Sequence, residues 1–211
     1  MKLLVTGFPK FDAYAENATE ALIESMRAGA PDALCELRDR LIFEIVHFDN
    51  DDAETQQQTM LESFHRLIEA HRPDACLFCG QAASRPWITL EAIAVNVFKG
   101  KVIDPDGPAA YWATIPEQES LAAAMREAGI PAKLSFHAGT HLCNHILYTA
   151  LRRADASGVA TPCGFLHLPM TNTQVISAEE DRPFIPLEVT RKALSMSIRH
   201  IAERVPGEYD T

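Results

Sequence analysis

Short apolar runs and apolar residues at helical spacing follow one another along the chain. The short runs, several of which end at a glycine, are typical of buried strands that lead into loops. They lie at residues 3–6, 41–46, 75–79, 88–97, 134–136 and 163–168. Helices are predicted at residues 18–26, 51–71, 121–128, 142–153 and 189–204. Strands that alternate with helices predict an α/β fold with a mostly parallel sheet, whose site gathers at the carboxyl ends of the strands. Because no linker or repeat interrupts the pattern, residues 1–211 are expected to form a single domain.

The charge of the chain narrows the class of partner. There are 19 Lys and Arg residues against 29 Asp and Glu, a formal net charge of −10. This balance argues against a nucleic-acid partner, because neutralising phosphates requires clustered cations. It also argues against a polybasic membrane anchor. The apolar start at residues 3–5 is too short for a signal peptide, and no 18-residue apolar stretch exists, so a reducing cytoplasm with free thiols is expected.

One of the five cysteines has a sequence setting that suits a nucleophile. Cys143 follows the small-residue turn Ala138-Gly139-Thr140 and is predicted to lie in or near the first turn of helix 142–153. Unpaired backbone N–H groups and the helix dipole at that place would lower the thiol pKa and stabilise an oxyanion. The alternative is a buried cysteine that packs as a small apolar residue, and the local sequence leaves both readings open.

A cysteine nucleophile needs a base, and His167 has the best position among the eight histidines. It lies near the end of the apolar run 163–168, where an α/β fold presents catalytic side chains. Glu91, in the apolar segment 88–97, is the candidate carboxylate that orients and charge-stabilises its imidazole. A hydrogen-bonded structural histidine and a solvated glutamate at a strand start are the alternatives.

The remaining histidines and cysteines suggest no second chemistry. His137, His141 and His145 are four apart, but Gly139 and Thr140 are expected to interrupt the helix, and no His-Glu-x-x-His motif is present, so no metal site is expected. Two cysteines have redox spacing within the apolar run 75–79, where positions three apart point to opposite faces of a strand. We therefore predict that these two residues, Cys76 and Cys79, both pack in the core. We assign no role to Cys35 or Cys163.

Two loops after predicted strands have side chains suited to bind a ring or an amide. Gly80 allows close backbone approach to a ligand, and Gln81 can hydrogen-bond an amide. Phe8 and Phe11 follow the first strand, where they either pack in the core or sandwich a flat ring.

Taken together, these motifs resemble the type I pyroglutamyl peptidases, also called pyrrolidone-carboxylate peptidases, over nearly the whole chain. The motifs that carry the resemblance are Thr6-Gly7-Phe8 with Phe11, Gly80-Gln81-Ala82 with Ile88-Thr89 and Glu91, Gly107-Pro108-Ala109-Ala110-Tyr111-Trp112, Ala138-Gly139-Thr140 with Cys143-Asn144-His145, and Gly164-Phe165-Leu166-His167 with Pro169.

The resemblance implies a cytoplasmic cysteine exopeptidase that removes N-terminal pyroglutamate from peptides through a thioester. It also implies a three-layer α/β/α sandwich, a homotetramer, and no cofactor or metal. By the same resemblance, Cys143 is the nucleophile, His167 the base and Glu91 its orienting carboxylate. The substrate-binding residues that it implies are Phe8 and Phe11, which hold the lactam ring, Asn17, which contacts the substrate, and Gln81 of the site loop.

The chain also departs from the family pattern. Lys101 replaces a common arginine, His141 replaces a common aromatic residue, and the segment between Asp106 and Gly107 is shortened. Two alternatives therefore stay open: a cysteine amidohydrolase of altered acyl specificity, and a non-catalytic paralogue that binds blocked N-termini.

Overall fold

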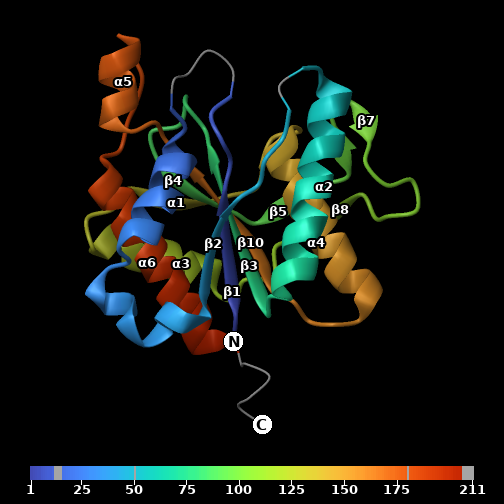
Figure 1. Ribbon diagram of the computed structural model, residues 1–211, viewed down its shortest axis with the longest axis horizontal. Coiled ribbons are helices and arrows are strands. Elements are labelled where there is room, and N and C mark those ends of the chain that lie inside the picture. Colours follow the sequence, from blue (N-terminus) through green and yellow to red (C-terminus); the bar gives the residue numbers. More distant parts are fainter. Residues whose placement is uncertain (12–15, 50, 180, 206–211) are drawn as a thin grey trace.

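A six-stranded sheet forms the centre of the molecule (Figure 1). The computed structural model describes residues 1–11, 16–49, 51–179 and 181–205. Across the sheet the strands follow in the order β2 (Leu41–Ile45), β1 (Leu3–Gly7), β3 (Ala75–Gln81), β10 (Cys163–Leu168), β4 (Ile88–Glu91) and β9 (Ala132–Ser135). Every neighbouring pair is parallel except β10 and β4, which are antiparallel. The predicted α/β fold with a mostly parallel sheet is therefore confirmed.

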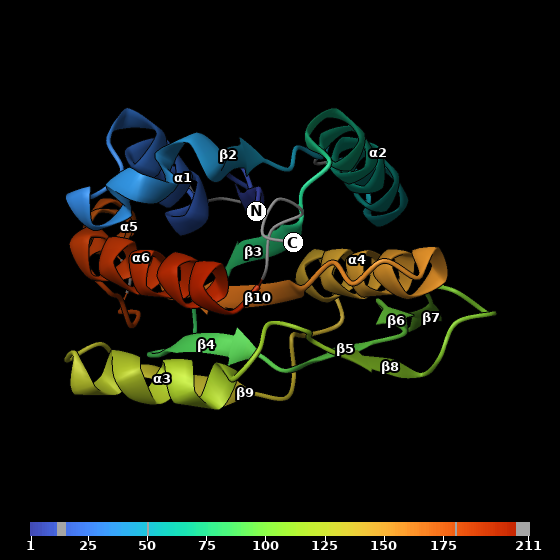
Figure 2. The same ribbon diagram turned by 90° about the horizontal axis from the view of Figure 1, so that it is seen from below.

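Helices cover both faces of this sheet, as Figure 2 shows from below. One face is covered by α1 (Ala18–Ala28), α3 (Gln118–Glu127) and α6 (Leu187–Arg204). The opposite face is covered by α2 (Ala53–His71) and α4 (Leu142–Ser157). The arrangement is a three-layer α/β/α sandwich, as the resemblance implied.

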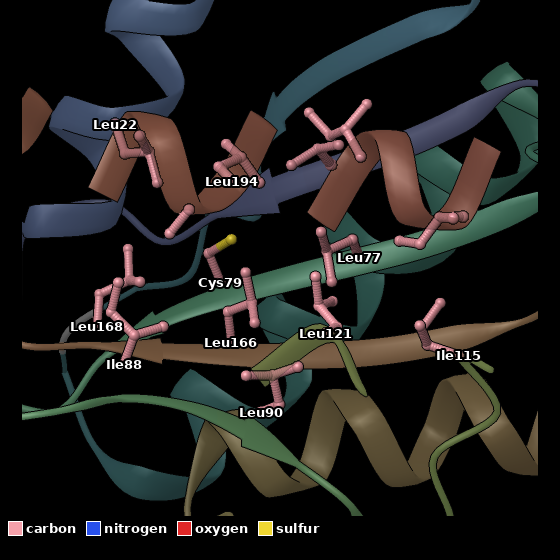
Figure 3. Close-up of a cluster of buried hydrophobic side chains, with 14 of the residues drawn as sticks. Leu22, Leu77, Cys79, Ile88, Leu90, Ile115, Leu121, Leu166, Leu168 and Leu194 are labelled. Carbon is pink, nitrogen blue, oxygen red and sulfur yellow. The ribbon is translucent and has the colours of Figure 1, made fainter. Parts of the chain in front are cut away.

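Each face of the sheet has its own apolar core, because successive strand side chains point to opposite faces. On the face of α1, α3 and α6, Leu77 and Cys79 of β3 pack with Leu166 of β10 (Figure 3). On the face of α2 and α4, the alternate β3 residues Cys76 and Phe78 are buried instead. Cys76 and Cys79 thus lie in two different cores, and the prediction that both are packing residues is confirmed.

Local signals placed most helices within a few residues. Asn17 caps the start of α1, because its side chain accepts a hydrogen bond from the backbone N–H of Thr19. Gly129 follows α3 with φ +78°, the left-handed conformation that ends many helices. Every described helix is too short or too polar to cross a lipid bilayer.

The segment 88–97 was predicted as one strand, and this prediction is wrong. It forms β4 and then β5 (Ile93–Val95) and the start of β6 (Val97–Phe98). After Glu91 the chain leaves the main sheet, and β5 pairs with β8 (Ala110–Trp112) while β6 pairs with β7 (Lys101–Val102). The partners come later in the sequence, so the apolar pattern of 88–97 alone does not show the break.

Two helical segments were not predicted. One is the 3₁₀ helix η1 (Asp32–Arg40), whose mostly polar sequence has only Leu34 buried. The other is α5 (Asn172–Ala178), which begins with a capping box between Thr171 and Gln174. The Thr-x-x-Gln pattern at its start was a signal that could have located it.

Candidate active site

Cys143 is the second residue of α4 and lies over the end of β3. A Cβ atom built on Gly80 would lie 2.8 Å from Cys143 Sγ and 2.6 Å from Phe165 Cζ. A side chain at position 80 would therefore collide with the Cys143 thiol and the Phe165 ring, which occupy the space above Gly80. In the register of β10 and β3, the residue opposite Gly80 is His167. The fold thus places the predicted nucleophile against the strand pair that carries the predicted base.

His167 and Glu91 form a buried pair. His167 Nδ1 lies 2.9 Å from Glu91 Oε1, and the two residues are 5% and 0% exposed. The antiparallel pairing of β10 with β4 sets this contact, since Thr89 is the register partner of His167 and Glu91 follows two residues later on the same face. The Thr89 hydroxyl donates a 2.8 Å hydrogen bond to the same carboxylate oxygen. Glu91 is therefore a buried residue at a strand end, not a solvated one.

Arg85 completes this arrangement, although no role was predicted for it. Its Nη1 donates to Glu91 Oε1 and to the Thr89 hydroxyl, and its Nη2 donates to the backbone carbonyl of His137 at 2.8 Å. One guanidinium thus joins the carboxylate to the loop that precedes Cys143. The sequence offered only an arginine in a loop near Gln81, which does not indicate its partner.

The environment sets the protonation of the histidine and the glutamate. Burial lowers the pKa of His167 below its ordinary value, even though the hydrogen bond and charge of Glu91 act to raise it. Burial acts to raise the pKa of Glu91, but the hydrogen bonds from His167, Ser135 and Thr89 outweigh it and leave that pKa lowered. At neutral pH the imidazole is therefore uncharged and donates its Nδ1–H to an ionised carboxylate. Its other nitrogen, Nε2, then has a free lone pair that can accept a proton.

The pKa of Cys143 differs from the sequence-based prediction. Burial and the nearby negative charge of Glu91 raise the pKa of the thiol to about 12. Its own backbone N–H at the helix start and the charge of Arg85 act to lower it, as predicted, but they are outweighed. The correction follows from packing: a thiol held over Gly80 loses more solvation than one helix terminus replaces.

The predicted substrate-binding residues gather at the ends of β1 and β3. Phe8 is buried and its ring meets Phe48 edge-on, with centroids 6.0 Å apart, while Phe11 is half-buried against the same core. Asn17 uses both ends of its amide within the protein, since Oδ1 caps α1 and Nδ2 donates to the Pro9 carbonyl.

Gln81 is held from two sides. Its Oε1 accepts hydrogen bonds from the Ala18 backbone N–H at 2.7 Å and from Gln174 Nε2 at 2.8 Å. Gln174 belongs to α5, so its contact with Gln81 joins α5 to this site. Both bonds use the side-chain oxygen of Gln81, so neither of them involves its amide N–H groups.

The three histidines spaced four apart do not share a helix face. His137 precedes α4 and is exposed, and Gly139, with φ +83°, turns the chain between it and the helix. His141 is the N-cap residue and His145 is buried in the first turn; both rings lie against Phe98. Within the described ranges, no group of three or more His, Cys, Asp or Glu side chains is placed to hold a metal ion.

The altered segment around Lys101 forms a hairpin held on α4. Lys101 itself is exposed on β7. The segment is fixed by Asn96, which binds the backbone of Asp104, and by Arg152, whose Nε donates to Asp104 Oδ2 at 2.8 Å. Asn144, next to the nucleophile, binds the backbone of β5 and β6 with its buried amide. The nucleophile helix is thus attached to the strands that leave the sheet after Glu91.

Comparison with known proteins identifies the family of the chain. The family described as pyroglutamyl peptidase matches residues 1–204. The pyrrolidone-carboxylate peptidase of Thermococcus kodakarensis is 36% identical, over 99% of both chains, and that of Deinococcus radiodurans is 38% identical over 68% of this chain and 71% of the relative.

Solved structures give the same result. The pyrrolidone carboxyl peptidase from Thermococcus litoralis has a TM-score of 0.80 at 26% identity, covering 96% of this chain and 93% of that one. The pyroglutamyl peptidase I from Bacillus amyloliquefaciens also has a TM-score of 0.80 at 26% identity, covering 95% and 94%. Because the family match spans almost the entire chain and the fold agrees, the chain belongs to the pyroglutamyl peptidase family of cysteine peptidases.

Proposed function

We propose that this chain is an exopeptidase that hydrolyses the amide bond after an N-terminal pyroglutamyl residue. The observation that carries the proposal is the placement of the Cys143 thiol over Gly80, whose register partner His167 is bonded to the buried Glu91. This is the order of groups that an acyl transfer through a nucleophile, a base and an orienting carboxylate requires. Membership in the family supports the choice of acyl group.

In the first half of the reaction, the Cys143 thiol and the His167 imidazole both start uncharged. As the pyroglutamyl carbonyl approaches, His167 Nε2 accepts the thiol proton and Cys143 Sγ attacks the carbonyl carbon. Free backbone N–H groups in the first turn of α4 stabilise the resulting oxyanion. His167 then gives the proton to the departing amine, the carbon–nitrogen bond breaks, and a thioester remains on Cys143.

In the second half water replaces the amine. His167 removes a proton from a water molecule, which attacks the thioester carbonyl. The carbon–sulfur bond breaks, the sulfur recovers the proton from His167, and free pyroglutamate leaves. Throughout, Glu91 stabilises the transient imidazolium, since its carboxylate oxygen is hydrogen-bonded to Nδ1.

The acyl group is a neutral lactam, so its recognition relies on ring contacts and amide hydrogen bonds. Phe8 and Phe11 supply apolar surface at the end of β1. Gln81 has N–H groups directed by the two bonds that hold its oxygen, and these can donate to a lactam carbonyl. Asn17 holds the Pro9 carbonyl, so it acts on the substrate by positioning the loop between Phe8 and Phe11.

The test is hydrolysis of a pyroglutamyl amide that releases a fluorescent amine. The wild-type chain is expected to release it, and Cys143→Ser to abolish release. Cys35→Ser is the matched control, because Cys35 is an exposed cysteine on η1, which carries none of the candidate site residues. Activity that survives Cys143→Ser would contradict the proposal. A panel of other N-acyl amides separates it from altered acyl specificity, and binding without turnover would indicate a non-catalytic paralogue.

The assembly and location proposed for this chain come from the family resemblance. We propose a homotetramer in the cytoplasm, with peptides that begin with pyroglutamate as its partners and with neither a cofactor nor a metal. Light scattering coupled to size-exclusion chromatography tests the assembly. A single species near the monomer mass of 23.3 kDa would contradict it.

A further inference from the structure

A small cavity lies beside the Glu91 pair on the side away from the predicted acyl pocket. Its volume is about 150 Å³. The residues that line it are Arg85, Pro86, Trp87, Thr89, Lys133 and Ser135. Two of them, Arg85 and Thr89, are hydrogen-bonded to Glu91. The cavity therefore shares a wall with the group that orients the predicted base.

The order of the strands places this cavity on the leaving-group side. The acyl-binding side chains follow β1 and β3, Cys143 lies over Gly80 of β3, and His167 is on the next strand, β10. Beyond it come β4 and then β9, which carry the cavity. An amide has its acyl group on one side and its amine on the other. A substrate whose ring lies at β1 therefore directs the residue after the scissile bond toward β4 and β9.

The sheet register also puts the cavity on the catalytic face. Lys133 is the register partner of Thr89, and Ser135 is the partner of Glu91. Paired residues in a sheet project to the same face. The Lys133 side chain thus starts from the face that carries His167 and Glu91.

The charges around the cavity favour an anion. Arg85 is already balanced by the carboxylate of Glu91. Lys133 Nζ lies 5.9 Å from the centre of the Trp87 ring, and in the described part of the chain it has no carboxylate partner within ion-pair distance. Trp87 is 37% exposed, and its ring forms an apolar wall beside this cation. The local balance is therefore one unpaired positive charge on a protein whose net charge is −10.

We propose that this cavity is a subsite for a carboxylate on the residue that follows pyroglutamate. The inference rests on the proposed hydrolase function and adds a preference for acidic leaving groups. Lys133 supplies the charge, and Trp87 supplies the apolar wall for the methylene groups. The carboxylate comes either from an acidic side chain or from the free C-terminus of a dipeptide.

The experiment compares kcat/KM for matched acidic and neutral substrates. Pyroglutamyl-glutamate amide against pyroglutamyl-glutamine amide tests a side-chain carboxylate. Pyroglutamyl-alanine against its amide tests a C-terminal carboxylate. The wild-type chain is expected to prefer the acid in at least one pair, by about two- to five-fold, as for an exposed ion pair. The preference is expected to fall at high salt, because an exposed pair is screened.

Lys133→Gln is expected to bring that ratio close to one. Lys2→Gln is the matched control, because it removes the same charge from an exposed lysine. Lys2 lies just before the first residue of β1, whereas the predicted acyl-binding residues follow the last one, so this variant is expected to keep the ratio. A wild-type ratio of one, or a ratio that Lys133→Gln leaves unchanged, would overturn the inference. So would an equal fall in Lys2→Gln.

A binding measurement separates this inference from the hydrolase proposal. The Cys143→Ser chain is titrated calorimetrically with the same acidic and neutral peptides, with and without Lys133→Gln. Tighter binding of the acid that depends on Lys133 supports the subsite even if the wild-type chain hydrolyses nothing, a result that would refute only the hydrolase function. Equal affinities for acid and amide would overturn the subsite even if hydrolysis is observed.

Discussion

Adding one methyl group at Gly80 tests how closely the nucleophile is placed. In Gly80→Ala the new Cβ would lie 2.8 Å from Cys143 Sγ and 2.6 Å from the tip of the Phe165 ring. Ordinary contacts of a Cβ atom begin near 3.4 Å. The sulfur must therefore move by roughly 0.6 Å, or the strand must shift by a similar amount, because close-packed interiors have no spare volume.

The magnitude follows from these distances. Overpacking of this kind typically costs about 1–3 kcal/mol of the free energy of unfolding. For a chain of this size that corresponds to a fall in Tm of about 2–12 °C. Misplacing a reacting atom by about 1 Å can cost about 100-fold in rate, so the sulfur shift is expected to lower kcat by about 10- to 100-fold. The fall in kcat should therefore be much larger than the small fraction of chain that is unfolded at 25 °C can explain.

The assay measures kcat and KM for a pyroglutamyl amide at 25 °C, with a thermal melt of the same sample. Gly29→Ala is the control, since Gly29 ends α1 with an extended backbone and a Cβ there meets nothing within 4 Å. This variant should keep both kcat and Tm. A folded Gly80→Ala chain that keeps wild-type kcat would refute the placement of the thiol over Gly80.

Four further predictions concern the protons of His167 and Cys143, the Arg85 guanidinium and the helix that carries the nucleophile. Because burial lowers the pKa of His167, the acid limb of kcat/KM should lie below the ordinary histidine pKa of 6.5; activity lost already above pH 7 would contradict this. Because the pKa of Cys143 is about 12, its alkylation by iodoacetamide should quicken about tenfold per pH unit from pH 7 to 9, and a plateau would indicate a resting thiolate. Arg85→Gln should lower kcat and cost about 1–3 kcal/mol in a denaturation titration, because a buried carboxylate loses a charged donor; an unchanged midpoint would contradict it. Asn144→Leu should lower the free energy of unfolding by at least about 1–3 kcal/mol, because the backbone N–H and C=O of Val95 both lose their hydrogen bond to the Asn144 amide. An unaltered Tm would refute that reasoning.

Much of the fold was readable from local patterns, because burial leaves a period in the sequence. Strand side chains alternate between two apolar cores, so the run 75–79 identified β3 and separated Cys76 from Cys79. The cap Asn17 and Gly129 marked helix ends through contacts within a few residues. The break after Glu91 was not readable, since β5 and β6 are defined by pairing with β8 and β7.

The candidate site divides in the same way. Cys143, His167 and Glu91 were selected by their residue types, their positions at predicted element ends and the family resemblance. The contact of Arg85 with Glu91 and the close approach of the Cys143 thiol to Gly80 depend on how β3, β10, β4 and α4 pack together. The same packing also reverses the direction of the pKa shift that the helix position predicted for Cys143. A helix terminus is a local property that the sequence determines, whereas desolvation depends on every element packed around the sulfur and exists only in the folded chain.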